Sequence, residues 1–512
     1  MASRTIEGTQ ASVKTETSSK TQELFKNTLA KKVSKVCTGY SSSSASDALT
    51  GVKVLDLTRV LAGPYCTQIL GDLGADILKI ERLKVGDDTR SWGPPFVGNT
   101  SCYFISINRN KRSICIDLKS QDGRKIIEKL AMQSDVLVEN YLPGKMEEYG
   151  LGYEDLKKIN SQLIYCSITG YGNTGPYASR PGYDVIASSI GGLMHITGPE
   201  DGAPCKTGVA LTDLATGLYA HGAIMAALFQ RQKTGTGQRI SANLLSTQVA
   251  CLVNLGSNYL MAGQEAKRWG TAHESIVPYQ AFATSDGYMT VGGTNDRQFR
   301  ELCLRIGRWD LCSDTKYQTN ALRVKHRSEL IDNIGKTLST KTNAEWIELF
   351  RGAHFSYGPI NSLSEVFTDP QVQHNRLIKE IDHPSAGTLK LVGPPVEFSN
   401  SGNYVRLPPP ELGQHTESVL RDRLGYSLVQ IQQLRDSGES TVVLTLKKPQ
   451  PSKKVGFSQD TVDNEHLGRK KSKCCCVYKK PHKFGESSSE SEDDECDHCS
   501  GHVEHKSSKD AT

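Results

Sequence analysis

The sequence predicts an α/β fold with a mostly parallel sheet and helices on both faces. Three observations support this class. Short apolar stretches alternate with longer amphipathic ones from residue 51 onward, turns rich in glycine and proline separate them, and 512 residues suffice for two or three domains with a large core. Strands that alternate with helices in this way pair in parallel, because each helix returns the chain to the same end of the sheet.

The first unit reads strand, helix, strand. Residues 52–57 form a short apolar stretch, Gly63-Pro64 places a proline at a helix start, residues 65–73 fit a helix, and residues 77–81 fit a second strand. The pattern returns as a strand at 113–118, a helix at 123–133, and strands at 135–139 and 163–168. Ligands bind such sheets beyond the carboxyl ends of the strands, which directs attention to loops 57–64, 80–88, 138–145 and 167–177.

One loop contains a glycine pattern that imitates a dinucleotide site. Residues 170–175 read GYGNTG after a strand, but Pro176 and the segment 180–182 oppose the helix that would face a pyrophosphate. A suitably spaced acidic ribose ligand is also missing. Residues 233–238, KTGTGQ, lack the phosphate-loop pattern and are expected to turn into a strand at 239–243.

The chain divides into five expected segments. Helical stretches with short strands dominate after residue 247, and residues 279–293 fit a hairpin that turns at 285–287. Pro408 to Pro410 form a rigid link before a closing helix in 411–426. The segments are a leader at 1–50, a large domain at 51–247 that closes with 376–435, a small α/β domain at 248–375, and a tail at 436–512.

Asp213 is the only formal charge between Gly208 and Gln230. A helix is expected at 214–229, so Asp213 fits an N-cap whose oxygens meet free backbone N–H groups. The alternative is a nucleophilic carboxylate, because a carboxylate that loses its water shell gains reactivity. The two interpretations stay open on this pattern alone.

Composition excludes several classes. A net charge of +5, from 61 basic and 56 acidic residues, is too balanced for nucleic-acid binding. No apolar run approaches the roughly 20 residues that span a bilayer, so no membrane association is expected. Nine cysteines scattered over residues 37–312 indicate reduced thiols of an intracellular protein, whereas five more crowd into the tail.

Both ends of the chain are predicted to be disordered, because they have too little apolar surface to fold alone. Residues 24–36 alternate apolar and lysine positions and resemble part of a mitochondrial transit peptide, although Glu7, Glu16 and Glu23 oppose it. A mitochondrial matrix location is expected, with a cytoplasmic location as the alternative.

A series of motifs follows along the body: LTRVLAGPYCTQILGDLGADILKIER, GDDTRSWGPPF, VENYLPGKMEEYGLGYEDL, YCSITGYGNTGPY, RPGYD and GVALTDLATGLYAHGAIMAAL. Together they resemble the class III CoA-transferases, and the resemblance covers residues 51–435. It implies an obligate dimer of two interlocked rings, each with a Rossmann-like large domain and a smaller α/β domain. It also implies an acyl-CoA and an acid as substrates, with coenzyme A as a substrate and no permanently bound cofactor.

The resemblance also assigns roles. Asp213 matches the catalytic aspartate, Val60 and Leu61 match a loop that lines the CoA thiol, and Arg82 matches a contact at the adenine or phosphate end. The remaining matches to the CoA cleft and the catalytic centre are Lys119, Asn140, Tyr141, Tyr183 and Asp184. Asp184 also fits a turn acid after Pro-Gly.

Two departures favour a larger acid than formate. Leu61 stands where the formyl-transferring relative has glutamine, and residues 275–282, SIVPYQAF, replace a glycine-rich flap. We expect CoA to move from succinyl-CoA to a dicarboxylic acid such as glutarate or 3-hydroxy-3-methylglutarate, with an aspartyl-CoA thioester on the way. A racemase of the same superfamily, or an inactive body attached to a phosphatase regulator, is the alternative.

A dicarboxylic acid needs a cation for its far carboxylate. The candidates by residue type are Arg59, Arg90, Arg109 and Arg268, and His195 and His273 are candidate donors to the substrate. Most surface arginines are only solvated, and most histidines are structural.

The tail resembles the inhibitor-3 family of protein phosphatase 1, through TVDNEHLGRKKSKCCCVYKKPHKFGESS. Lys454, Val455 and Phe457 match its docking tetrapeptide, which would add as a strand to the phosphatase catalytic subunit. A zinc site or a reduced thiol cluster are both open for Cys474, Cys475, Cys476, Cys496 and Cys499. An enzyme body and a phosphatase inhibitor indicate either a true fusion or two neighbouring genes read as one.

Overall fold

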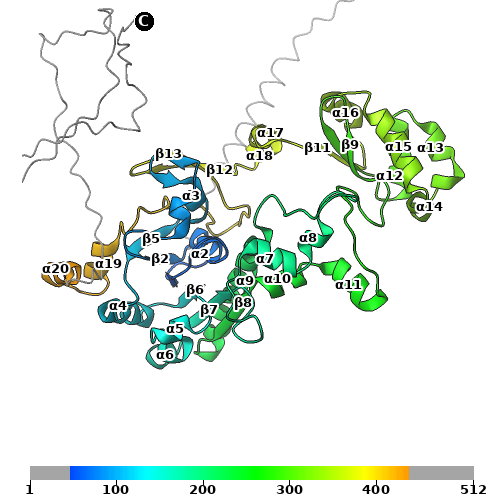
Figure 1. Cartoon of the computed structure of the whole chain (residues 1–512). Coiled ribbons are helices and arrows are strands. Elements are labelled where there is room, and N and C mark those ends of the chain that lie inside the picture. Colours follow the sequence, from blue (N-terminus) through cyan, green and yellow to red (C-terminus); the bar gives the residue numbers. More distant parts are fainter. Residues whose placement is uncertain (1–46, 437–512) are drawn as a thin grey trace, which may run out of the picture. The chain divides into compact units, whose positions relative to one another are not determined.

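The computed structural model describes residues 47–436 (Figure 1). The chain divides into two compact units, Met1–Leu446 and Lys447–Thr512, and all described residues belong to the first. The predicted transit peptide, the docking tetrapeptide and the tail cysteines lie outside the described residues and stay predictions.

The first unit contains a six-stranded parallel sheet. Its strands are β1 (Lys53–Asp56), β2 (Asp76–Glu81), β5 (Lys111–Cys115), β6 (Val136–Glu139), β7 (Ile164–Thr169) and β8 (Arg239–Asn243), in the order β5-β2-β1-β6-β7-β8. The predicted parallel sheet is confirmed, and its order is that of a Rossmann-like fold. The order reverses between β1 and β6, which is where such sheets bind ligands.

Helices cover both faces of this sheet, because successive strand residues point to opposite sides. Val54 packs in one core with α2 (Ala62–Asp72), α7 (Asp184–Ile190) and α9 (Leu211–Thr234), whereas the next residue, Leu55, packs in the other. That second core contains residues from α4 (Gln121–Met132), α5 (Lys145–Glu148), α6 (Tyr153–Ile159), α19 (Thr416–Asp422) and α20 (Leu428–Asp436).

The last described segment completes the second core. Val419, Leu420 and Ile431 are buried in it, although they lie more than three hundred and fifty residues from β1 in sequence. The edge strand β5 is covered as well, since the Cys115 N–H donates to Thr416 Oγ1 at 3.1 Å. This cover removes an exposed strand edge.

Helix α9 corrects the expected position of Asp213. The helix begins at Leu211 with Ala210 as N-cap, so Asp213 lies inside the first turn and is not the cap. The helix also runs on to Thr234, where Gly235 ends it with a φ of 70°. The earlier start is possible because a distant carboxylate, that of Asp184, accepts the Asp213 N–H at 3.1 Å.

A separate core lies within residues 277–355. The predicted hairpin is confirmed as β9 (Tyr279–Ala283) and β10 (Tyr288–Gly292), and β11 (Ser356–Pro359) pairs with β10. The helices here are α12 (Asp296–Arg305), α13 (Trp309–Ser313), α14 (Asn320–Lys325), α15 (Arg327–Leu338) and α16 (Asn343–Phe350). The exact limits of a small domain stay a prediction.

Several elements connect these parts. They are β3 (Phe96–Val97), β4 (Thr100–Ser101), α3 (Cys102–Ile107), α8 (Leu193–Ile196), α10 (Leu244–Ala250), α11 (Val253–Ala262), α17 (Leu363–Thr368), α18 (Pro370–His374), β12 (Ile378–His383) and β13 (Gly387–Val392), with 3-10 turns at Asp88–Ser91 and Thr315–Tyr317. Helix α11 buries none of its residues, and Leu260 and Met261 are 84% and 82% exposed. No helix between residues 47 and 436 has both the length and the apolar character needed to cross a bilayer.

Candidate active site

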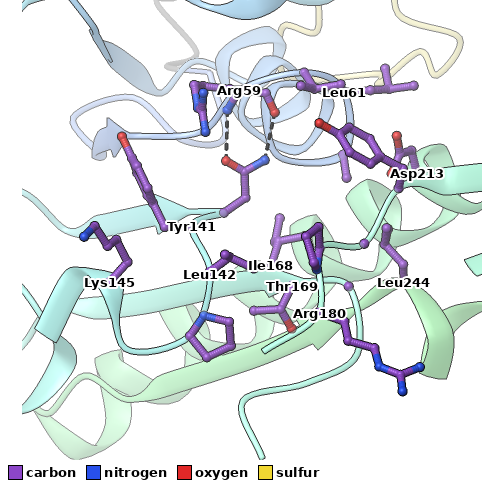
Figure 2. Close-up of a pocket in the computed structure, with 18 of the residues that line it drawn as sticks. Arg59, Leu61, Tyr141, Leu142, Lys145, Ile168, Thr169, Arg180, Asp213 and Leu244 are labelled. Atoms are coloured by element: carbon purple, nitrogen blue, oxygen red, sulfur yellow. Dashed lines mark hydrogen bonds between the residues drawn. The ribbon is translucent and has the colours of Figure 1, made fainter. Parts of the chain in front are cut away.

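A cavity of about 500 Å³ opens at the carboxyl ends of β1, β6 and β7 (Figure 2). This is the point where the strand order reverses, so its place agrees with the expected ligand crevice. Its lining combines the ends of three predicted loops with Asp213. The lining residues used below are Arg59, Val60, Leu61, Asn140, Tyr141, Lys145, Arg180, Tyr183 and Asp213.

Asp213 presents a buried carboxylate to this cavity. Its residue is 9% exposed, and within the described part of the chain no side chain or backbone group donates a hydrogen bond to its carboxylate oxygens. Burial, together with the negative charge of Asp184, raises the pKa of Asp213 to about 7. A carboxylate without donors in a cleft retains its basicity and its lone pairs for chemistry.

The pH dependence follows from this pKa. Below about pH 7, Asp213 becomes protonated, so kcat/KM of a reaction that uses its carboxylate as the nucleophile should fall, approaching a tenfold loss per pH unit on the acid side. Asp184→Asn removes a negative charge that raises the pKa of Asp213, so its acid limb should move to lower pH. Asp155→Asn, which lies on the exposed surface, is the control. If the acid limb of the pH profile did not move in the Asp184→Asn variant, Asp213 would not be the group that titrates.

The loop after β1 carries an uncommon backbone conformation. Val60 has a φ of 72°, which is strained for a β-branched residue and costs on the order of 1–3 kcal/mol. Its N–H donates to Asp87 Oδ1 at 3.1 Å. The Asn140 side chain bonds both backbone polar groups of Arg59, the residue before Val60. It accepts from the Arg59 N–H at 3.0 Å and donates to the Arg59 carbonyl at 2.8 Å.

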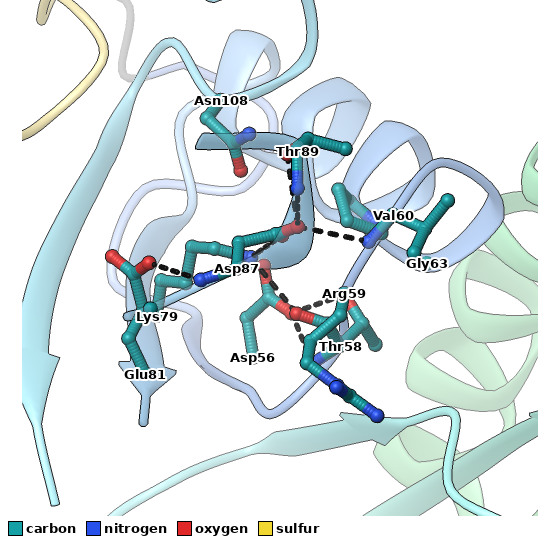
Figure 3. A network of polar contacts seen from close by, with 12 residues as sticks. Asp56, Thr58, Arg59, Val60, Gly63, Lys79, Glu81, Asp87, Thr89 and Asn108 are labelled. Carbon is teal, nitrogen blue, oxygen red and sulfur yellow. Dashed lines mark hydrogen bonds and ion pairs between the residues drawn. The ribbon is translucent and has the colours of Figure 1, made fainter. Parts of the chain in front are cut away.

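Two buried ion pairs support this loop, and Figure 3 shows Lys79 and Asp87 of the first. Lys79 Nζ lies 2.9 Å from Asp87 Oδ2, Lys111 Nζ lies 3.1 Å from Asp56 Oδ2, and all four side chains are fully buried. Burial alone would raise the pKa of Asp87, but the Lys79 charge and backbone donors lower that pKa to about 2. Burial outweighs the attraction of Asp56 at the other pair and lowers the pKa of Lys111 to about 8.

The structure brings most of the predicted CoA and catalytic residues together. Val60, Leu61, Asn140, Tyr141, Tyr183 and Asp213 all line the cavity. Asp184 does not line it but contacts the Asp213 backbone. Arg82 also lies outside the lining and donates to Asp88, which is in it, at 2.5 Å. Lys119 is exposed after β5 and outside the lining.

Of the candidate arginines, Arg59 lines the cavity and is paired with Asp88 at 2.9 Å. The other three lie outside the cavity lining. Each is engaged elsewhere: Arg90 by both oxygens of Glu81, Arg109 by both oxygens of Asp72, and Arg268 by the carbonyls of Gly202 and His195.

The two candidate histidines lie outside the cavity lining. His195 lies 3.7 Å from Glu265 on the surface, and the His273 ring stacks on Tyr279 with their centroids 5.6 Å apart. Residues 47–436 contain no cluster of three or more metal-ligating side chains.

Three residues at or near the site were not selected from the sequence. Arg180 and Lys145 line the cavity. Tyr103 in α3 lies near two carboxylates: burial, followed by the charges of Asp213 and Asp184, raises the pKa of Tyr103. Arg180 and Lys145 lie in or beside loops that the sequence predicts to bind ligands, so their positive charge could have identified them as site residues. No local sequence pattern identifies Tyr103 as a site residue.

The tail has its own similarity. Residues 431–495 match the family model described as "Protein phosphatase inhibitor".

Comparisons of the body give one consistent answer. Residues 49–416 match the model of CoA-transferase family III. The chain is 54% identical over 390 residues to the succinyl-CoA:glutarate CoA-transferase of Homo sapiens, covering 76% of this chain and 89% of that one. It is 41% identical to the succinate–glutarate CoA-transferase of Agrobacterium fabrum, covering 73% and 95%. Among solved structures, a CAIB/BAIF family protein from Brucella suis aligns with a TM-score of 0.68 at 40% identity, covering 74% of this chain and 99% of that one. The chain therefore belongs to CoA-transferase family III and is an enzyme of this class.

Proposed function

We propose that this enzyme moves CoA from succinyl-CoA to a dicarboxylic acid such as glutarate or 3-hydroxy-3-methylglutarate. The names of its relatives support succinyl-CoA as the donor and glutarate as the acceptor. The observation that carries the proposal is the carboxylate of Asp213, which is buried, lacks hydrogen-bond donors within the described residues and faces the cavity at the sheet's switch point.

Asp213 carries the acyl exchange in four steps. Its carboxylate attacks the acyl carbonyl of succinyl-CoA, and the CoA thiolate leaves from a mixed anhydride. The thiolate then attacks the aspartyl carbonyl, which releases succinate and leaves an aspartyl-CoA thioester. The incoming carboxylate attacks this thioester and expels the thiolate, which finally attacks the new acyl group and frees Asp213. Each step exchanges one acyl bond for a similar one, and exclusion of water protects the anhydride.

The thioester gives the direct test. The full chain is incubated with succinyl-CoA alone and treated with hydroxylamine, and the peptide containing Asp213 is analysed by mass spectrometry. We expect a hydroxamate on Asp213 and, with glutarate added, formation of glutaryl-CoA. A racemase would instead exchange the α-proton of an acyl-CoA without this adduct, and that result would overturn the proposal.

Arg180 is the expected partner of the far carboxylate. Of the cations in the lining, Arg59 is paired with Asp88 and Lys145 with Glu148, whereas Arg180 stacks over the Tyr177 ring at 4.0 Å and has no carboxylate partner within residues 47–436. Loss of a charged hydrogen bond costs about 1.5–3 kcal/mol. Arg180→Ala should therefore raise KM for glutarate about 10- to 100-fold, and Arg180→Lys should restore part of this.

Steady-state kinetics with matched acids check this prediction. Butyrate, which lacks the second carboxylate, should be used equally well by the wild type and the Arg180 variant. An equal loss for both acids, or a raised KM for the CoA thioester, would instead place Arg180 against CoA.

A homodimer is proposed as the working form. Its support is an apolar surface that residues 47–436 leave open, on α9 and α11: Leu218, Tyr219, Phe229, Val253, Tyr259, Leu260 and Met261. Large apolar side chains left exposed in this way are typical of subunit interfaces. Native mass spectrometry should give twice the mass of the chain, and a monomer at micromolar concentration would contradict it.

A second function is proposed for the tail, because residues 431–495 match the phosphatase inhibitor model. The full chain should bind the catalytic subunit of protein phosphatase 1 and inhibit it. Val455→Ala with Phe457→Ala should weaken binding at least tenfold, since both side chains would fill pockets on the partner. Calorimetry measures this, and Val442→Ala with Val443→Ala is the control. Equal affinity of the two double variants would show that Val455 and Phe457 do not dock the phosphatase.

A further inference from the structure

The strained turn at Val60 is unusual in where it lies. Five non-glycine residues in the described part of the chain have positive φ: Val60, Lys84, Asn110, Val253 and Arg376. Of these, Val60 lines the cavity that contains Asp213. Strain of this kind persists only where the surroundings hold it, and it concentrates at functional sites.

One peptide group controls this conformation. The peptide between Arg59 and Val60 has two polar atoms, the Arg59 carbonyl oxygen and the Val60 N–H. The first accepts from Asn140 Nδ2 at 2.8 Å, and the second donates to Asp87 Oδ1 at 3.1 Å (Figures 2 and 3). A flip of this peptide is the simple route from positive to negative φ at Val60, and it would break both bonds.

Both groups that hold this peptide are themselves fixed. Asp87 is anchored by the buried Lys79 and accepts the Thr89 N–H at 3.0 Å. Asn140 follows β6, and its second polar atom is also used, because Oδ1 accepts the Arg59 N–H at 3.0 Å. The Asn140 amide therefore uses both its oxygen and its nitrogen to hold the backbone of Arg59.

We propose that Asn140 and Asp87 are positioning residues: they clamp the Arg59–Val60 peptide and so hold Val60 and Leu61 in the strained turn that faces Asp213. The start of α2 also lies close to this loop, since a Cβ on Gly63 would lie 2.4 Å from Thr58 Cβ and would force one of them to shift. The loop that contains Val60 is therefore tightly packed against the start of α2. This inference rests on the proposed transfer only for its kinetic readout.

A double-mutant cycle on the full chain tests the clamp. Asn140→Ala should lower kcat about 30-fold or more, because Val60 then relaxes out of the turn. Val60→Gly should raise the melting temperature by about 2–4 °C, since glycine adopts positive φ freely. In the Val60→Gly background, the kcat penalty of Asn140→Ala should shrink to less than about fivefold, because no strain drives the relaxation.

The controls separate positioning from general stability. Asn160 also bonds backbone carbonyls through its amide, those of Ala131 and Ser134 at 2.9 Å each, but lies outside the cavity lining. Asn160→Ala should lower the melting temperature without changing kcat and without coupling to Val60→Gly. Asn140→Asp keeps the acceptor for the Arg59 N–H, loses the donor, and should give an intermediate kcat.

Three outcomes would overturn the clamp. The first is that Asn140→Ala lowers kcat equally in the wild-type and Val60→Gly backgrounds. The second is that Asn140→Ala leaves kcat unchanged and raises KM for succinyl-CoA. The third is that Asn160→Ala couples to Val60→Gly as strongly as Asn140→Ala does. If the wild type transfers no CoA, the proposed function fails, yet the clamp is still tested. In that case Asn140→Asp and Val60→Gly must couple in melting temperature, and additive shifts would reject it.

Discussion

Asp213→Asn should abolish CoA transfer, with kcat lowered about 10⁴-fold or more. The amide has nearly the shape of the carboxylate but is a far weaker nucleophile, so neither the anhydride nor the aspartyl-CoA thioester can form. Glutaryl-CoA formation from succinyl-CoA, followed by liquid chromatography, measures the loss. Retained turnover would remove Asp213 from the mechanism.

The same variant should be more stable than the wild type above pH 7. The raised pKa means that the folded protein binds a proton at Asp213 more tightly than the unfolded chain, so ionisation of the buried group costs stability. Removing that charge should raise the free energy of unfolding by a few kcal/mol above pH 7. The gain should disappear below about pH 4, where Asp213 is protonated in both states. An inactive but destabilised variant would show that misfolding, not lost chemistry, explains the inactivity.

Asp56→Ala should destabilise the body by about 3–5 kcal/mol at neutral pH. The substitution leaves the Lys111 ammonium fully buried with only the neutral oxygens of Asn108 and Pro64 as partners. It also removes the acceptor for the hydroxyls of Thr58 and Thr67. Urea unfolding, followed by circular dichroism, measures the change.

A surface ion pair provides the matched control. Asp155 lies 3.1 Å from Lys158 within one helix, and the two side chains are 43% and 72% exposed. Asp155→Ala should cost less than about 1 kcal/mol. Similar losses for the two variants would contradict the buried role of Asp56.

The sheet could be predicted from the sequence, because each strand is a short apolar stretch whose residues face two cores. Val54 and Leu55 illustrate this, as they are adjacent yet buried in opposite layers. Helix starts were less predictable. The N-terminal turn of α9 is capped by Asp184, which lies 29 residues away, and no local pattern reports such a contact.

The residue types and loops of the site could be predicted from the sequence, but the hydrogen-bond and ion-pair partners of its residues could not. Val60, Tyr141 and Asp213 reach one cavity because parallel strands end at the same edge. By contrast, Arg90 and Arg109 look free in sequence, and only the fold reveals their carboxylate partners. Asn140 lines the cavity, as the resemblance implies, but its two bonds to Arg59 could not be read from the sequence.

The packing of α19 and α20 against the first strands has a consequence for biosynthesis. Leu55 is made early, whereas Leu420 and Ile431 in the same core emerge only after nearly all of the body has been translated. A nascent chain on the ribosome therefore keeps part of one face of its sheet open until the final helices leave the exit tunnel. Chaperones that shield apolar surface during synthesis would have their longest task on that face.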